Sequence, residues 1–334
     1  MKVKSTMKAI WYEKTGKADE VLVCGERQKP APRPGEVLVR VEYSAVHPSD
    51  VKKRAGFQPA GFEDGFVIPH SDGSGIIEDV GEGVEERRGE RVWIYQAQYG
   101  RHCGSCAEYI ALPSWMAPKL PDSADFSIGA CIGIPVMTAH RCLHVAGDPA
   151  DKVVLVTGAS GRVGYYAVQW AKLANATVIA TAGTDENCQT ALDAGADWVL
   201  NYRESDLARR ILECAGSRGV DHIIDVEFGQ NAKVSAEVLN NCGTIATYSS
   251  SSDPEPLIPF YPMMFKNISV HTVLVYSMPD AARQQAVNAV NDALSGEQLK
   301  HRVSAIFSFA ETAKAHELIE SGGAAGCVLI RVPG

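Results

Sequence analysis

The chain has 334 residues, 46% of them hydrophobic and 22% charged, and a formal net charge of −8. This length exceeds the usual size of a single hydrophobic core and predicts two domains. No run of Lys and Arg suited to a phosphate backbone is present, so we do not expect nucleic acid as the main partner. No apolar stretch is long enough to cross a bilayer, and the N-terminus lacks the apolar core of a signal peptide. We therefore expect a cytoplasmic protein without a membrane partner.

Short strands separated by Gly and Pro dominate the first part of the chain. Glu36–Tyr43 comes close to an alternation of apolar and polar residues, which predicts a half-buried strand. Further strands are expected at Met7–Glu13, 75–80, Arg91–Ile94 and Glu108–Ala111. Short strands with irregular connections predict a compact β barrel or sandwich.

The pattern changes near Ser123, where helices are expected at 127–134 and 136–145 with a break at Pro135. Strands and helices then alternate, which predicts a doubly wound α/β sheet. The expected strands are Lys152–Val156, Thr177–Ala180, Trp198–Leu200, His222–Val226 and Thr244–Tyr248, with helices at Gly161–Leu173 and Asp185–Ala194. A strand at Val270–Tyr276 and a helix at Asp280–Leu294 follow a Ser- and Pro-rich loop. The last segment, strand–helix–strand from Val303 to Val332, is expected to complete the first domain.

The strongest local motif is the glycine-rich run 156–164, Val-Thr-Gly-Ala-Ser-Gly-Arg-Val-Gly, between an expected buried strand and an expected helix. Glycines let a pyrophosphate lie against backbone N–H groups at the positive end of a helix. The spacing is G-x-x-G-x-x-G rather than G-x-G-x-x-G, but the strand–turn–helix context is the one a dinucleotide site requires. A plain tight turn is the alternative. The cofactor contacts expected here are Ser160, Gly161, Arg162 and Val163.

The residues at the end of the second strand of the α/β sheet indicate whether NAD or NADP binds. An NAD site usually has Asp or Glu about 20 residues beyond the glycine motif, on the ribose hydroxyls. Here the tip ends in Gly183 and Thr184 without a carboxylate, which leaves room for a 2′-phosphate and favours NADPH. Asp185, which follows at once, could instead turn back onto an NAD ribose. Tyr202 and Arg203 either reach the phosphate or are ordinary surface residues.

Several further segments carry a resemblance to a known family. Val46-His47-Pro48-Ser49-Asp50 is similar to a V-N-P-x-D motif, and Pro-His-Ser-Asp-Gly-Ser-Gly at 69–75 is similar to P-G-S-D-x-x-G. Ala107-Glu108-Tyr109, Ile-Gly-Ile-Pro-Val-Met-Thr-Ala at 132–139 and the glycine-rich run follow in the expected order. This ordered set resembles the medium-chain dehydrogenase/reductase superfamily, specifically its zinc-independent quinone oxidoreductase, or zeta-crystallin-like, branch.

The resemblance implies an α/β fold in which a Rossmann doubly wound parallel sheet domain is inserted into a GroES-like β-barrel catalytic domain. The GroES-like domain would comprise residues 1–125 and 266–334, and the NADP-binding domain residues 126–265. The active site would lie in the cleft between the domains. The family is commonly dimeric through the strand at Val270–Tyr276, so a homodimer is expected.

The resemblance also implies that no metal is bound. Zinc enzymes of the superfamily hold catalytic zinc with Cys, His and Cys, whereas this chain has Val46-His47-Pro48 at the first Cys and Ser71 at the His. The lone pair Cys103-Gly104-Ser105-Cys106 lacks the second C-x-x-C that closes a structural zinc site. Cys103 and Cys106 are expected to be free thiols, and the alternatives are that they bind an adventitious metal or form a redox pair. The nine Cys are scattered, and most are expected to be buried free thiols.

By the same resemblance, Thr138 would pack beside the nicotinamide, and Ser249 with the backbone from Leu274 to Tyr276 would hold the carboxamide. Thr138 could otherwise be a packing residue and Ser249 a residue of a strand-end turn. The branch often has Asn at the position of His47 and Tyr at the position of Lys52. His47 could donate a hydrogen bond to a substrate oxygen. Lys52 could do the same or be solvated surface.

Without a zinc ion no Lewis acid polarises an alcohol or a simple ketone, which favours acceptors that take hydride readily. The leading hypothesis is reduction of quinones by NADPH, in which the protein supplies orientation and a hydrogen-bond donor. The alternatives are reduction of an enone, a carbon–carbon double bond conjugated to a carbonyl, and a cofactor-binding structural or RNA-binding protein related to zeta-crystallin.

Overall fold

The computed structural model describes residues 5–58, 62 and 64–334. The chain divides into two compact units, the first made of Met1–Ile134 and Val287–Gly334 and the second of Pro135–Ala286. Both boundaries lie further along the chain than the expected positions at 126 and 265. The reason is that each boundary falls inside a helix, α4 (Gly133–His144) or α10 (Asp280–Ser295), rather than in a linker.

The first unit is built on a sheet of six strands in the order β13-β14-β3-β4-β5, with β6 paired to β3. Its strands are β3 (Glu36–Val46), β4 (Asp72–Val80), β5 (Arg91–Ile94), β6 (Tyr109–Pro113), β13 (Val303–Ser308) and β14 (Cys327–Arg331). A separate antiparallel pair is formed by β1 (Thr6–Trp11) and β2 (Val23–Gln28). β14 pairs antiparallel with β3, so the C-terminal segment completes the first unit as expected.

Apolar side chains of these strands form the core of the first unit. Val37, Val39, Ile110 and Val328, from three different strands, are at most 1% exposed. The helices of this unit are α1 (Ala18–Val21), α2 (Pro48–Ala55), α3 (Phe126–Ala130) and α11 (Thr312–Glu320). α2 interrupts a stretch for which the sequence indicated only strands.

A chain of polar side chains runs through this apolar core. Nε2 of His316 lies 2.9 Å from Nε2 of His70, whose Nδ1 lies 2.8 Å from the hydroxyl of Ser44. That hydroxyl lies 2.8 Å from the hydroxyl of Ser105, which donates to the backbone carbonyl of Asp72 at 2.6 Å. The side chains of all five residues are fully buried.

The directions of the hydrogen bonds from Ser105 to His70 follow from the last member of the chain. Ser105 uses its one hydroxyl hydrogen on the Asp72 carbonyl, so Ser44 must donate to Ser105 and His70 must donate to Ser44 from Nδ1. Burial lowers the pKa of His70 well below its usual value and that of His316 to about 3, so both rings are neutral. Nε2 of a neutral His70 carries no hydrogen and therefore accepts from the Nε2–H of His316.

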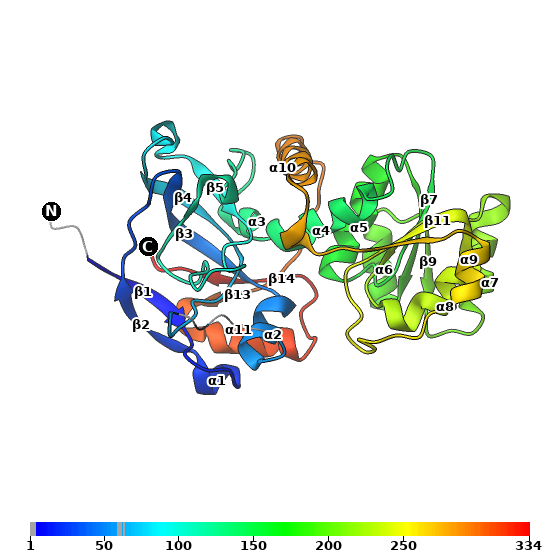
Figure 1. Ribbon diagram of the computed structural model, residues 1–334, viewed down its shortest axis with the longest axis horizontal. Helices are drawn as coiled ribbons and strands as arrows, with labels where there is room; N and C mark the ends of the chain where they lie inside the picture. Colours follow the sequence, from blue (N-terminus) through cyan, green and yellow to red (C-terminus); the bar gives the residue numbers. More distant parts are fainter. Residues whose placement is uncertain (1–4, 59–61, 63) are drawn as a thin grey trace. The chain divides into compact units, whose positions relative to one another are not determined.

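The second unit contains a sheet of six parallel strands in the order β12-β11-β10-β7-β8-β9, which confirms the predicted doubly wound fold. Its strands are β7 (Val153–Val156), β8 (Thr177–Ala182), β9 (Trp198–Asn201), β10 (Val220–Asp225), β11 (Leu239–Thr247) and β12 (Ser269–Thr272). The remaining helices are α5 (Arg162–Leu173), α6 (Asp185–Asp193), α7 (Leu207–Ala215), α8 (Phe228–Val238) and α9 (Phe260–Phe265). α5 and α7 lie on opposite faces of the sheet (Figure 1). All four residues of β7 are buried, as expected for a central strand covered on both faces.

Two local expectations were wrong. α4 begins at Gly133 and contains Pro135, because proline is tolerated in the first turn of a helix, where its missing N–H has no intrahelical partner. The strand expected at Val270–Tyr276 ends at Thr272, and Val275–Ser277 forms a short 3-10 turn. None of the helices in the described part of the chain is long and apolar enough to cross a membrane.

Candidate cofactor site and active-site residues

The carboxyl edge of the parallel sheet gathers most of the expected cofactor residues. The glycine turn follows β7, Gly183 follows β8, Tyr202 follows β9 and Ser249 follows β11. From β7 the chain continues to β8 and β9 on one side, and β10, β11 and β12 lie on the other. The strand order therefore reverses between β7 and β10, and ligands of open α/β sheets bind at such a switch point.

The glycine turn has the geometry needed for close approach of a phosphate. Gly158 has a left-handed backbone (φ 60°), and a Cβ on Gly164 would lie 2.4 Å from the Gly158 carbonyl oxygen. α5 therefore packs directly against the turn. Ser160 and Gly161 lie in the turn itself, and Arg162 and Val163 open the helix. The first N–H groups of a helix have no intrahelical partner and carry the positive end of its dipole, which suits an anion.

A buried carboxylate that the sequence analysis did not single out holds this turn in place. Oδ1 of Asp225, at the end of β10, accepts the hydroxyl of Thr157 at 2.7 Å and the amide of Asn231 in α8, also at 2.7 Å. The Thr157 hydroxyl in turn accepts the N–H of Val226 at 3.0 Å. Burial raises the pKa of Asp225, and the hydrogen bonds from Thr157 and Asn231 oppose this shift. The position of the glycine turn is thus fixed from the neighbouring strand.

The tip of β8 brings together the residues expected around the adenosine ribose. A Cβ on Gly183 would lie 2.5 Å from the Tyr202 hydroxyl oxygen, so the phenol packs against the backbone of the glycine. The guanidinium carbon of Arg203 lies 5.9 Å from the centre of that ring. Thr184 caps α6 by accepting the N–H of Asn187 at 3.2 Å. These side chains leave a polar, partly exposed surface with an arginine beside it.

The residues expected near the nicotinamide lie on three elements of the second unit. The backbone carbonyl of Ser249 accepts the N–H of Phe228 at 3.0 Å, which ties the strand end to the start of α8. Leu274 is half exposed, and Tyr276 lies in the 3-10 turn after β12. Thr138 is buried in α4 and only 5% exposed.

In the first unit, the candidate His47 lies between β3 and α2 and is paired with a carboxylate. Its Nε2 is 2.8 Å from Oδ2 of Asp72, and both side chains are buried. The same oxygen accepts the N–H of Ile134 at 2.5 Å, at the start of α4. The N–H of His47 donates to Oδ2 of Asp50 at 2.8 Å. Two buried aspartates therefore hold the backbone and the ring of His47.

Lys52 and its neighbour Lys53 differ in environment. Lys52 is partly buried, whereas Lys53 is only 8% exposed and donates from Nζ to Oε1 of Gln98 at 2.8 Å. Burial lowers the pKa of Lys53, and the charge of Asp50 opposes this shift. Burial also raises the pKa of Asp50. Nothing in the local sequence pattern indicated that Lys53, rather than Lys52, would be the buried lysine.

The described residues contain no group of three or more His, Cys, Asp and Glu that could hold a metal ion. His70, next to the position of the family's zinc-binding His, is instead engaged by Ser44 and His316. Cys103 is partly exposed and Cys106 is buried, and neither forms a disulfide. Burial raises the pKa of both thiols.

Comparisons with known proteins find families similar to both parts of the chain. Residues 33–122 match the alcohol dehydrogenase GroES-like domain, and residues 163–292 match the zinc-binding dehydrogenase family. The chain is 32% identical over 330 residues to the quinone oxidoreductase of Lama guanicoe, with 97% of each chain covered.

Two solved structures share the fold of the whole chain. A mycobacterial protein in complex with NADPH has a TM-score of 0.85 at 26% identity, covering 97% of this chain and 99% of that one. An NAD-dependent alcohol dehydrogenase has a TM-score of 0.89 at 27% identity, covering 98% and 100%. With a GroES-like unit, a Rossmann unit and relatives of this similarity along its whole length, the chain belongs to the medium-chain dehydrogenase/reductase superfamily, in its quinone oxidoreductase, zeta-crystallin-like branch.

Proposed function

We propose that the chain is a quinone reductase that uses NADPH and transfers hydride without a zinc ion. The observation that carries the choice of cofactor is the tip of β8. Gly183 stands where an NAD enzyme has a ribose-binding acid, and Tyr202 and Arg203 lie beside it. A phosphate on the 2′ position would meet a guanidinium and a phenol there instead of a carboxylate. The complex of a mycobacterial relative with NADPH supports the same choice.

The pyrophosphate would lie against the glycine turn, at the N-terminus of α5. Arg162 opens this helix and adds a positive charge at its first position, where a phosphate would be held by N–H groups. Ser160, Gly161 and Val163 would line the same path. The nicotinamide would be held by Thr138, Ser249 and the backbone of Leu274–Tyr276.

The bound nicotinamide supplies a hydride, and reduction of a quinone to a hydroquinone also consumes a proton. His47 is the candidate donor toward the quinone oxygen, with Lys52 as an additional polar group. Nε2 of the ring lies 2.8 Å from Oδ2 of Asp72, so the imidazole and the carboxylate form a buried pair. Quinone as acceptor rests on the relatives: quinone oxidoreductases match the chain along almost its whole length.

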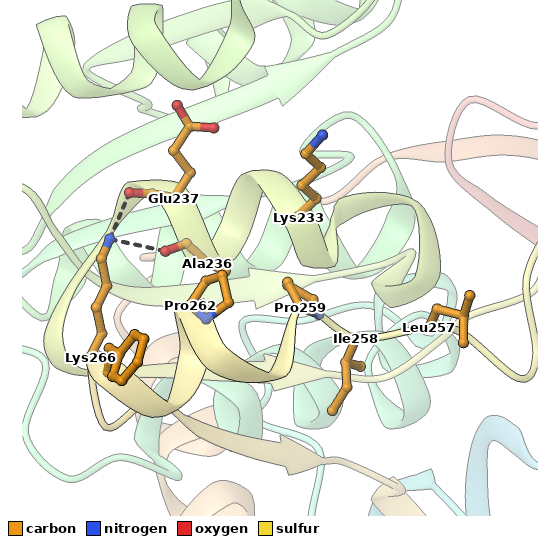
Figure 2. A pocket seen from close by; sticks show the side chains of 9 residues that line it. Lys233, Ala236, Glu237, Leu257, Ile258, Pro259, Pro262 and Lys266 are labelled. Carbon is orange, nitrogen blue, oxygen red and sulfur yellow. Dashed lines mark hydrogen bonds between the residues drawn. The ribbon is translucent and has the colours of Figure 1, made fainter.

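A homodimer through β12 is part of the proposal. β12 ends the strand order of its sheet, and three of its four residues are exposed. A hollow of about 700 Å³ lies between α8 and residues 257–266, the segment that precedes β12 in the chain (Figure 2). The Lys266 ammonium closes one end of this hollow by donating to the carbonyls of Ala236, Glu237 and Leu239 at 2.9, 2.7 and 2.8 Å. Large apolar residues are exposed around it, namely Leu257, Ile258, Phe260, Tyr261, Met264 and Phe265.

Pairing of β12 with the same strand of a second copy would extend the sheet and cover these side chains. Sedimentation velocity tests this: we expect the wild type to sediment as a dimer and Val270→Asp as a monomer. A monomeric wild type would contradict this part of the proposal.

The activity is tested by following the loss of NADPH absorbance with purified protein and an ortho-quinone. NADH and a conjugated enone serve as matched controls, and a zinc chelator is added to a parallel reaction. Rapid turnover of the quinone with NADPH, unchanged by the chelator, is the expected result. Turnover of the enone alone would make the protein an alkene reductase. Binding of NADPH without any turnover would favour a cofactor-binding structural role.

A further inference from the structure

A hollow in the first unit is lined by residues that the proposed reaction does not use. Its volume is about 610 Å³, within the range of roughly 300–1,000 Å³ that small-molecule sites occupy. Three arginines line it: Arg27, Arg33 and Arg101. The protein as a whole carries a net charge of −8, so three guanidinium groups around one hollow create a local positive field in an acidic protein.

Arg101 is a partly buried cation. Its guanidinium donates to the backbone carbonyl of Ala111, while its Nε is buried and has no hydrogen-bond partner among the described residues. Burial lowers the pKa of Arg101, and the nearby Glu36 offsets only part of that penalty. A desolvated cation with an unused N–H is stabilised by an anion that reaches it.

Arg27, in β2, also lines the hollow and is held in place by aromatic rings. Its guanidinium carbon lies 4.1 Å from the ring centres of both Trp11 and Phe66, so the charge is stacked between two aromatic faces. One Nη lies 3.0 Å from Oε1 of Glu13, and Nε is buried without a partner among the described residues. A cation fixed in this way loses little conformational entropy when it binds a ligand.

The remaining charge and the apolar residues of the hollow define the other requirements of a ligand. Arg33 is exposed at the rim of the hollow, where its backbone N–H donates to Oε2 of Glu36 at 3.0 Å. Among the apolar residues that line the hollow, Phe66 is partly exposed, whereas Ile68 and Ile110 are each 1% exposed. An inorganic ion would leave the exposed part of Phe66 in contact with water, whereas an anion on a flat apolar body would cover it.

We propose that this hollow is a binding site for a small aromatic carboxylate, separate from the residues assigned to NADPH and quinone. The carboxylate would lie between the guanidinium groups, and the ring would pack against the exposed part of Phe66. Glu36 would keep the site selective for monoanions, because a second negative charge on the ligand would approach this carboxylate.

The proposal is tested by isothermal titration calorimetry with 2-naphthoate on protein saturated with NADPH, so that the dinucleotide site is filled. The neutral 2-naphthamide has the same ring and serves as the matched ligand. We expect binding of one naphthoate per chain and binding of naphthamide about tenfold weaker, since a charge-assisted hydrogen bond is lost. Equal binding of the two ligands, or no binding of naphthoate, would overturn the proposal.

Two substitutions and a control connect binding to the arginines. Arg33→Gln and Arg101→Gln should each weaken naphthoate binding by about tenfold. Arg209→Gln, which removes an exposed arginine paired with Glu213 in α7, should leave it unchanged. Because Arg33 is exposed, its variant is expected to fold even if Arg101→Gln does not. Unchanged binding to Arg33→Gln would contradict the assignment.

Cys103 reports where the ligand lies, because its side chain also lines the hollow and is partly exposed. Alkylation by iodoacetamide, followed by peptide mass spectrometry, should become slower at Cys103 when naphthoate is present. The exposed Cys24 and Cys242 are internal controls whose rates should not change. Naphthoate binding that leaves the alkylation of Cys103 unchanged would locate the ligand elsewhere and refute the proposal.

Discussion

Replacing His316 with leucine tests the buried chain of hydrogen bonds through its dependence on pH. In the native protein His316 donates to His70, and both rings are neutral and fully buried. In the unfolded chain both rings are solvated and titrate near the ordinary histidine pKa of about 6.5. The folded-state pKa of His316 is about 3 and that of His70 is also well below 6.5. The unfolded state therefore binds more protons as the pH falls.

This linkage fixes both the sign and the size of the effect. Stability from each histidine is fully present above pH 6.5 and is lost as the pH falls toward the folded-state pKa. Consider a histidine whose pKa is about 6.5 in the unfolded chain and that stays neutral in the folded protein. It lowers the free energy of unfolding by about 2 kcal/mol when the pH falls from 7.5 to 5.0. The pair should cost about 4 kcal/mol, and His316→Leu should remove about half of that dependence.

Urea unfolding followed by circular dichroism at pH 7.5, 6.5, 5.5 and 5.0 measures this dependence. His316→Leu will lower stability at every pH, so the comparison is the change with pH rather than the absolute value. Ile319→Val in the same helix is the control, because it loses about 1 kcal/mol of packing without removing a titrating group. It should retain the full wild-type dependence. If His316→Leu also retains it, His316 does not stay neutral in the folded protein and the reasoning fails.

Four further variants test the candidate site. Asp225→Asn should raise the Kd for NADPH by about tenfold, measured by fluorescence titration, because a neutral amide oxygen replaces the charged acceptor that Thr157 and Asn231 share. Arg203→Gln should raise the KM for NADPH by about tenfold and leave the KM for NADH unchanged, since only NADPH has a 2′-phosphate. His47→Ala should lower kcat with quinone by about 100-fold if the imidazole donates a proton. Gly164→Val should lower stability by about 1–3 kcal/mol in thermal unfolding, because its Cβ would lie 2.4 Å from the Gly158 carbonyl oxygen.

Each of these has a result that would contradict it. Equal effects of Arg203→Gln on NADPH and NADH would remove the arginine from the 2′-phosphate site. Unchanged NADPH affinity in Asp225→Asn would mean that the turn is held by other contacts. Wild-type kcat in His47→Ala would leave Lys52 as the remaining candidate in the first unit. Wild-type stability in Gly164→Val would mean that α5 can move away from the turn.

The order of the fold could be predicted because each parallel strand is a nearly continuous apolar run with a helix after it. That pattern identifies β7, β8 and β10 within two residues at either end. Boundaries that depend on backbone partners could not be read in this way. Pro135 suggested a break between two helices. It lies instead in the first turn of α4, and the sequence alone does not show at which residue that helix begins. The strand at Val270 ends at Thr272 because its pairing with β11 ends there, although apolar residues continue.

The glycine turn and the tip of β8 were accessible to sequence reasoning because both depend on residues close together in the chain. The two carboxylates, Asp72 and Asp225, were not. Their roles come from partners distant in sequence, His47 and Thr157, and burial gives no distinctive spacing. Asp72 did lie inside a motif that resembled the family, and this was the available signal.

The three carbonyl contacts of Lys266 have a chemical consequence. An ammonium group has three hydrogens, and all of them are engaged at the end of α8. Acylation leaves a single N–H on the nitrogen, so at least two of these bonds must be lost when the amine reacts. Lys233 lines the same hollow on an exposed position of α8 (Figure 2). An amine-directed reagent should thus label Lys233 and spare Lys266. Of the two lysines in this hollow, one can be labelled selectively and the other has a structural role.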